Sequence, residues 1–259
     1  MKRFLLSLTL AIVSASTAFS VTPERRPDTS GRFAFVGFGT YRTGFGGEIP
    51  LCTYSIVKHG LLLTAKHCFT HVGSPSNPAQ VKNLKVTFPG LVSLSGGDLK
   101  DIVLDPGPND LAYVTYEAAR TAALISLPPM RIATALPSLD TPLLMPGFPN
   151  APAALRKLIV SQPCTLNGRH GTFPPKPKDA GYEGELWEMA CPAWRGQSGS
   201  PLIEVVEEGL VIHGVLTHTF QVKADGAIDP AVIQSDKVGS FVPLSMFSPL
   251  WLAASEDKL

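Results

Sequence analysis

The sequence predicts an all-β protein. From Phe33 onward, short apolar runs are separated by Gly, Pro, Asn and Asp, a pattern typical of β sandwiches and barrels. The 24 prolines among 259 residues leave little room for long helices, because proline lacks a backbone N–H donor. A hydrophobic content of 44% over this length is enough to build one large domain or two small lobes.

The first lobe is predicted to span residues 33–120. It contains a hairpin whose strands are Tyr54–Lys58 and Leu61–Ala65 and whose turn is His59-Gly60. Further strands are expected at three apolar runs, which are Val81–Phe88, Ile102–Leu104 and Leu111–Tyr116.

The second lobe is predicted to span residues 142–242, after a crossing at 121–141 in which small apolar residues alternate with prolines. Its strands are expected at Leu143–Phe148, Leu158–Pro163, Leu186–Cys191, Pro201–Val206 and Leu210–Phe220. The tail at 243–259 has a helical composition around Trp251 and predicts a short C-terminal helix.

Residues 1–20 have the pattern of a secretory signal peptide. Met1-Lys2-Arg3 precedes the apolar run Phe4–Val13, and small residues follow. A membrane anchor is the alternative, but the run is shorter than the roughly 20 apolar residues that a spanning helix needs. Residues 21–32 are polar, contain two prolines and predict a flexible leader. The protein is therefore expected to be secreted or periplasmic.

Charge and cysteine content exclude several classes of function. A net charge of +1 lacks the basic excess of a nucleic-acid-binding surface. The four cysteines all follow the signal peptide, fit an oxidising compartment and allow three pairings into two disulfides. Free thiols or a cysteine metal site are disfavoured, because no Cys-x-x-Cys spacing occurs. We expect no metal, no organic cofactor and no membrane anchor.

The stretch Arg195–Pro201, Arg-Gly-Gln-Ser-Gly-Ser-Pro, has the residues needed to make a serine nucleophilic. A hydroxyl is a weak nucleophile at neutral pH and needs a base and donors for the developing oxyanion. Glycines on both sides of Ser198 permit a tight turn in which the N–H groups of Gly196 and Ser198 point at one spot. Ser200 is the nearest rival nucleophile, and an ordinary surface turn is the alternative interpretation.

A histidine upstream is the candidate base. His67 follows an apolar strand in Thr64-Ala-Lys-His-Cys68, and imidazole can take up and release a proton near neutral pH. A zinc site shared by His67 and His71 is the alternative. It is disfavoured because Cys68 stands where the familiar metalloprotease pattern requires Glu.

Asp110 is the candidate partner of that histidine. It opens an apolar strand in Asn109-Asp-Leu-Ala112 and would accept the second ring N–H of His67. A turn cap is the alternative role for this residue. Three other acids lie nearby in the sequence and compete for the same role, namely Asp98, Asp101 and Asp105.

The three segments Leu63–Cys68, Asn109–Ala112 and Gly196–Pro201 resemble the signature segments of chymotrypsin-like serine proteases, in that family's order of His, Asp and Ser. The order is informative, because the same triad occurs in other orders on unrelated folds. The Gly-x-Ser-Gly-Ser-Pro form is closer to the bacterial secreted, glutamyl-endopeptidase-like branch. The resemblance covers about residue 31 to the C-terminus, and its specificity lies in these three segments.

This resemblance implies a fold of two six-stranded antiparallel β-barrels and a peptide-hydrolysing triad. Ser198 would be the nucleophile, His67 the general base and Asp110 its partner. The N–H groups of Gly196 and Ser198 would form the oxyanion hole. The expected partner is a protein or peptide substrate, and the chain is expected to act as a monomer.

The resemblance also bears on the cysteine pairing. It places a disulfide beside the histidine, which favours Cys52 with Cys68, and these two residues also flank the predicted hairpin. Cys164 with Cys191 then follows by elimination.

Gln197 departs from the digestive enzymes of the family, in which an aspartate precedes the serine and pairs with a newly freed N-terminus. Glutamine cannot make that ion pair, and no similar activation sequence occurs near Phe33. We therefore expect a site that is organised without that kind of cleavage.

The substrate pocket is expected between the loop before the serine and the strand at 211–220. Its predicted lining residues are Pro192, Leu216, Thr217 and Thr219. Glutamyl endopeptidases have a histidine where Leu216 stands, and no acid falls at the expected pocket base near Pro192, so a small or apolar residue is the expected preference. Thr217 is also a candidate to brace the aspartate.

A second class of function remains open from the sequence, a catalytically lapsed binding protein on the same fold. Lys66 beside the histidine and Gln197 beside the serine leave room for it. A third possibility, a β-protein whose motifs arose by chance, is disfavoured by the ordered occurrence of all three segments.

Overall fold

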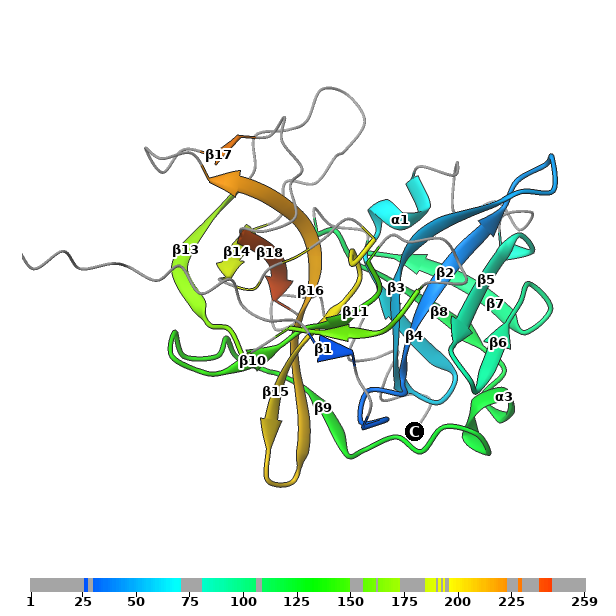
Figure 1. Ribbon diagram of the computed structural model, residues 1–259, viewed down its shortest axis with the longest axis horizontal. Coiled ribbons are helices and arrows are strands. Elements are labelled where there is room, and N and C mark those ends of the chain that lie inside the picture. The colour runs from blue at the N-terminus through cyan, green and yellow to red at the C-terminus, as the bar shows by residue number, and fades with distance from the viewer. Residues whose placement is uncertain are drawn as a thin grey trace, which may run out of the picture.

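The computed structural model describes residues 26–27, 30–70, 81–105, 109–149, 156–161, 163–172, 185–189, 191, 193, 196–222, 228–229 and 238–243. This part of the chain is mostly β-sheet and includes two four-residue helices, α1 (His67–Thr70) and α3 (Ala119–Ala122) (Figure 1). The predicted all-β class is thereby confirmed. The predicted signal peptide and C-terminal helix lie outside the described residues, apart from Pro243.

The first part of the chain forms a seven-stranded antiparallel sheet in the order β6-β5-β2-β3-β4-β8-β7. Its strands are β2 (Val36–Arg42), β3 (Glu48–Lys58), β4 (Leu61–Thr64), β5 (Leu84–Phe88), β6 (Val92–Leu94), β7 (Leu99–Leu104) and β8 (Ala112–Tyr116). Buried and half-buried residues alternate along β5 and β8, as expected for strands with one face on a core. The predicted hairpin is confirmed, and Gly60 in its turn adopts φ +92°.

Irregular pairing gives this sheet its curvature. The register shifts between Phe38 and Thr40, between Ile56 and Lys58, and between Leu99 and Ile102. Such bulges increase the local twist and bend the strand that carries them. The sheet curls as a half-barrel (Figure 1).

The second part of the chain forms an eight-stranded sheet with the main order β10-β15-β16-β18-β14-β13. These strands are β10 (Leu143–Leu144), β13 (Leu166–Thr172), β14 (Glu185–Met189), β15 (Pro201–Val206), β16 (Gly209–Val222) and β18 (Val238–Pro243). Two further strands pair with β16, namely β9 (Met130–Ile132) and β17 (Ile228–Asp229). The predicted crossing therefore contains a strand, β9, which adds to the second sheet in parallel.

A three-stranded sheet lies between the other two in Figure 1 and consists of β1 (Arg26–Pro27), β12 (Ile159–Val160) and β11 (Pro146–Gly147). Two predictions need correction here. The leader expected to be flexible includes β1, which pairs with the free edge of β12. The single strand predicted at 143–148 is divided between β10 and β11, because Pro146 has no N–H with which to continue the first ladder.

The larger hydrophobic core joins the two main sheets. It packs buried residues of the seven-stranded sheet against Ile203, Ile212 and Val215 of β15 and β16. A smaller cluster on the other face of the same strands includes Leu202 and Leu216. Strands β15 and β16 therefore lie between two cores, with successive side chains alternating between them.

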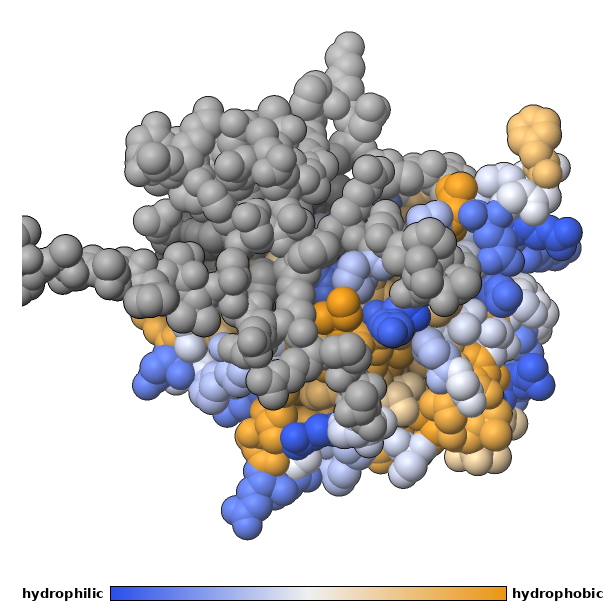
Figure 2. All heavy atoms as spheres, in the orientation of Figure 1, coloured by the Kyte–Doolittle hydropathy of each residue, from blue (hydrophilic) through white to orange (hydrophobic). Residues whose placement is uncertain are grey.

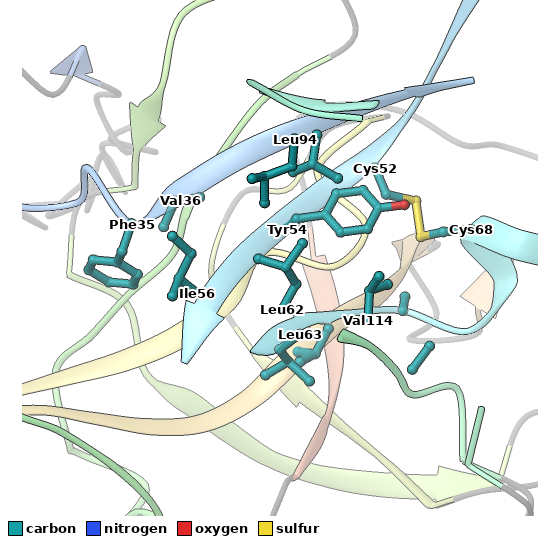
Figure 3. Close-up of a cluster of buried hydrophobic side chains, with 14 of the residues drawn as sticks. Phe35, Val36, Cys52, Tyr54, Ile56, Leu62, Leu63, Cys68, Leu94 and Val114 are labelled. Atoms are coloured by element: carbon teal, nitrogen blue, oxygen red, sulfur yellow. A yellow bond between two sulfur atoms is a disulfide. The ribbon is translucent and has the colours of Figure 1, made fainter. Parts of the chain in front are cut away.

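Figure 3 shows part of the larger core, where Tyr54 lies among aliphatic side chains and its hydroxyl points toward the Cys52–Cys68 disulfide. Both predicted disulfides, Cys52–Cys68 and Cys164–Cys191, are present. The described residues include no helix that is long and apolar enough to cross a membrane. Figure 2 shows polar and apolar residues interspersed over the described part of one face.

Candidate active site

His67 is the first residue of α1, and two residues separate it from the end of β4. Strand β4 ends at Thr64, and the chain turns into the helix through two hydrogen bonds, from Cys68 N–H to Ala65 O (3.3 Å) and from Phe69 N–H to Lys66 O (3.0 Å). The Cys52–Cys68 disulfide then ties α1 to β3. The backbone that carries the imidazole is therefore held on both sides.

Asp110 meets His67 with both carboxylate oxygens. Its Oδ1 accepts the backbone N–H of His67 at 2.7 Å, and its Oδ2 lies 2.6 Å from the ring Nδ1. The aspartate side chain is 1% exposed and the histidine side chain 16% exposed. A buried carboxylate is stable only where donors surround it, so this geometry assigns the ring proton to Nδ1. Nε2 is then the nitrogen that can accept a proton.

The pairing of β4 with β8 explains why these two residues meet. Thr64 at the end of β4 lies opposite Ala112 at the start of β8. His67 follows the first by three residues and Asp110 precedes the second by two, so both lie at the same end of the paired strands. This juxtaposition agrees with the predicted partnership of the histidine and the aspartate.

The loop before Asp110 is also tied down. The Nζ of Lys66 donates to the backbone carbonyl of Asp105 at 2.8 Å, and the Nδ2 of Asn109 donates to the carboxylate of Asp105 at 3.4 Å. The backbone N–H of Asp105 donates to Leu111 O at 2.9 Å. Lys66 was one reason to keep a lapsed binding protein as an alternative. In the structure its side chain hydrogen-bonds Asp105, in the segment that precedes Asp110.

Ser198 lies in a tight turn between two glycines in the left-handed region. Gly196 has φ +94° and Gly199 has φ +85°. The N–H of Ser200 donates to Gln197 O at 2.8 Å and closes the turn. The predicted conformational role of the glycines is consistent with these angles.

This turn packs directly against the strands that lead to the histidine. A side chain on Gly199 would collide with Thr53 O and Thr64 Oγ1 and would lie 3.3 Å from Ala65 N. The carbonyl of Ser198 accepts the N–H of Thr53 at 2.8 Å. The structure therefore brings the serine loop of the second sheet against the middle of β3 and the end of β4, beside the residues that precede His67.

The predicted pocket residues are only partly described. Leu216 and Thr217 are buried, and Leu216 packs in the smaller core cluster. The Leu216 backbone holds the serine turn by accepting the N–H of Gly199 at 2.7 Å. Pro192 and the side chain of Thr219 lie outside the described residues, so the pocket stays a prediction.

One group of possible metal ligands occurs among the described residues, Cys52, His67 and Cys68. The two sulfurs are bonded to each other and are therefore not available as thiolate ligands. His71, the second histidine of the alternative zinc site, lies outside the described residues.

Sequence reasoning missed two residues that shape this site. Thr53 and Thr64 are fully buried threonines whose hydroxyls bond backbone groups at the contact between the two sheets. The residues around Thr53 give no sign of its role, because its partner Gly196 is 143 positions away, and Thr64 bonds Thr53 itself.

In comparisons with known proteins, no protein-family model matches this chain and no curated protein is significantly similar to it.

Proposed function

We propose that this protein is an exported serine endopeptidase of the chymotrypsin-like kind, acting through Ser198, His67 and Asp110. The observation that carries the proposal is the buried Asp110 carboxylate bonded to Nδ1 of His67, together with a serine turn packed on Thr64, the last residue of the strand that leads to the histidine. A ring held in this way keeps Nε2 as the nitrogen that can act as a base, and a base of this kind is what a serine hydroxyl needs to become a nucleophile.

In the proposed reaction, Nε2 of His67 takes the proton of Ser198 as its oxygen attacks the peptide carbonyl. The N–H groups of Gly196 and Ser198 stabilise the oxyanion of the tetrahedral intermediate. The imidazolium returns the proton to the leaving amine, and an acyl-enzyme remains. Water, activated by the same imidazole, then releases the acid and restores the serine.

In this proposal the two main sheets correspond to two six-stranded barrels, with the site at their contact. Support comes from the distribution of the residues: the histidine and aspartate flank strands of the seven-stranded sheet, and the serine precedes β15 of the eight-stranded sheet. We further propose a preference for small or apolar substrate residues, no cofactor, and action as a monomer in the periplasm or medium.

Hydrolysis of peptides tests the proposed function. The purified secreted chain is incubated with a mixed peptide library, and cleavage products are identified by mass spectrometry. We expect cleavage by the wild type, and a loss of about 10⁴-fold or more in Ser198→Ala and in His67→Ala. Folded wild type that cleaves nothing would favour the lapsed binding role.

A further inference from the structure

Thr53 connects the serine turn to the rest of the site through all of its polar groups. It lies in β3, directly after Cys52, and is fully buried. Its N–H donates to Ser198 O at 2.8 Å, and its hydroxyl donates to Gly196 O at 3.3 Å. The same hydroxyl accepts the N–H of Phe148 at 3.0 Å, and its carbonyl accepts the hydroxyl of Thr64 at 2.8 Å.

These bonds fix the backbone on both sides of Gln197. The carbonyls of Gly196 and Ser198 are both anchored to Thr53, and the N–H of Ser198 belongs to the peptide between them. Gly196 has φ +94° and no side chain to limit its rotation. The hydrogen bond from the Thr53 hydroxyl therefore restrains the backbone of Gly196, which has no side chain that could do so.

The two anchors differ in what they demand of residue 53. Any residue except proline can supply the backbone N–H that bonds Ser198 O. The bond to Gly196 O requires a short side chain with a hydroxyl, and that hydroxyl is itself oriented by the N–H of Phe148. The side chain of Thr53 thus adds a hydrogen bond to Gly196 O that the backbone of β3 alone does not provide.

Thr53 also links the serine turn to the strand that leads to His67. Its carbonyl bonds Thr64, which is three residues before His67 on the adjacent strand β4. One residue therefore contacts the backbone of the proposed nucleophile and the strand that carries the proposed base.

We infer that Thr53 is a positioning residue, whose hydroxyl sets the orientation of the Gly196–Ser198 backbone and hence of the oxyanion donors. This inference rests on the proposed function. It assigns the organisation of the turn to neutral hydrogen bonds within the fold, which need no newly freed N-terminus.

A matched control separates positioning from ordinary stabilisation. Thr121 on α3 is equally buried, and its hydroxyl lies 2.7 Å from the Tyr116 hydroxyl and 3.0 Å from Nδ1 of His59. Thr121→Val makes the same change at a buried, bonded threonine of α3, which is not part of the serine turn or its contacts. A purely structural role for Thr53 predicts the same outcome at both positions.

The experiment measures kcat and KM for p-nitrophenyl acetate, a small ester that makes little use of a peptide pocket, with Ser198→Ala as the background. We expect Thr53→Val to lower kcat by about 10- to 100-fold with little change in KM, because small displacements of catalytic groups are costly. Thr53→Ser should keep most of the wild-type kcat. Thr121→Val should lower the thermal midpoint but keep kcat.

Thr53→Ala serves as the second variant if Thr53→Val does not fold, and rates are expressed per folded molecule by near-ultraviolet circular dichroism. Active wild type with equal kcat in the Thr53 and Thr121 variants would overturn this inference alone. Wild type that does not exceed the Ser198→Ala background would overturn the proposed function, and this inference with it.

Discussion

At the scale of single residues, Asp110 shows how burial and hydrogen bonding define a role. Both of its oxygens serve one neighbour, His67, through the backbone N–H and through Nδ1. The carboxylate therefore fixes both the position and the tautomer of the ring. In the proposed reaction it would also stabilise the imidazolium that forms when Ser198 loses its proton.

Asp110→Asn should reduce the hydrolysis rate by about 10⁴-fold, because an amide NH₂ facing Nδ1 favours the opposite tautomer. Asp105→Asn is the control, since it neutralises a carboxylate of the same loop that accepts from Asn109, while Nδ1 of His67 keeps its bond to Asp110. Rates on one peptide substrate compare the two variants. Equal rates in Asp110→Asn and Asp105→Asn would contradict the assigned role.

Tyr54 is a buried residue with a stability consequence that depends on pH. Among the described residues its hydroxyl has no hydrogen-bond partner, and burial raises its pKa above the ordinary value of 10. The folded state therefore keeps the phenol neutral. Above pH 10 the unfolded chain loses that proton and the folded chain does not, so the free energy of unfolding falls by up to about 1.4 kcal/mol per pH unit.

Tyr54→Phe should leave stability at pH 7 unchanged or raise it by about 1 kcal/mol, and should make the alkaline decline shallower. Tyr116→Phe is the control, because its hydroxyl lies 2.7 Å from the Thr121 hydroxyl, and it should cost about 1 kcal/mol. Urea unfolding between pH 7 and pH 11 measures both. A clear loss of stability at pH 7 in Tyr54→Phe would refute this interpretation.

At the scale of elements, the site depends on how closely the serine turn approaches β3 and β4. Gly199 permits that approach, because the space beside its Cα is filled by Thr53 O and Thr64 Oγ1. It also adopts φ +85°, which side chains other than that of glycine rarely tolerate. Contact and conformation therefore both require glycine here.

Gly199→Ala should cost about 2–5 kcal/mol, from left-handed strain together with collision in a packed region. Gly90→Ala isolates the first effect, because Gly90 has φ +74° with nothing within 4 Å of an added Cβ, and it should cost about 1–2 kcal/mol. Guanidinium unfolding gives both values. Similar losses at the two positions would show that the close approach is unimportant.

At the scale of the whole molecule, the sequence predicted those features that depend on local pattern. The hairpin that turns at Gly60 and the strand Pro201–Val206 were predictable because apolar runs between turn residues specify strands locally. The meeting of His67 with Asp110 was predicted from the apolar strand that follows Asp110 together with the resemblance of both segments to the family's. The parallel strand β9 was not, since Met130–Ile132 is three residues long and follows two prolines.

The contact between the two sheets was beyond sequence reasoning for a physical reason. Thr53 bonds Gly196, and 143 positions separate the two residues. Such a bond depends on the packing of two complete sheets, through the core that Ile203, Ile212 and Val215 share with the first sheet. Nothing in the residues around Thr53 signals a partner so distant.

Whether His67 activates Ser198 can be measured by peptide mapping after reaction with a fluorophosphonate. We expect a phosphonyl adduct on Ser198, formed with loss of fluoride, that is absent in Ser198→Ala, falls sharply in His67→Ala and persists in Ser200→Ala. A folded protein that gains no adduct, or one whose adduct lies on Ser200, would contradict this expectation.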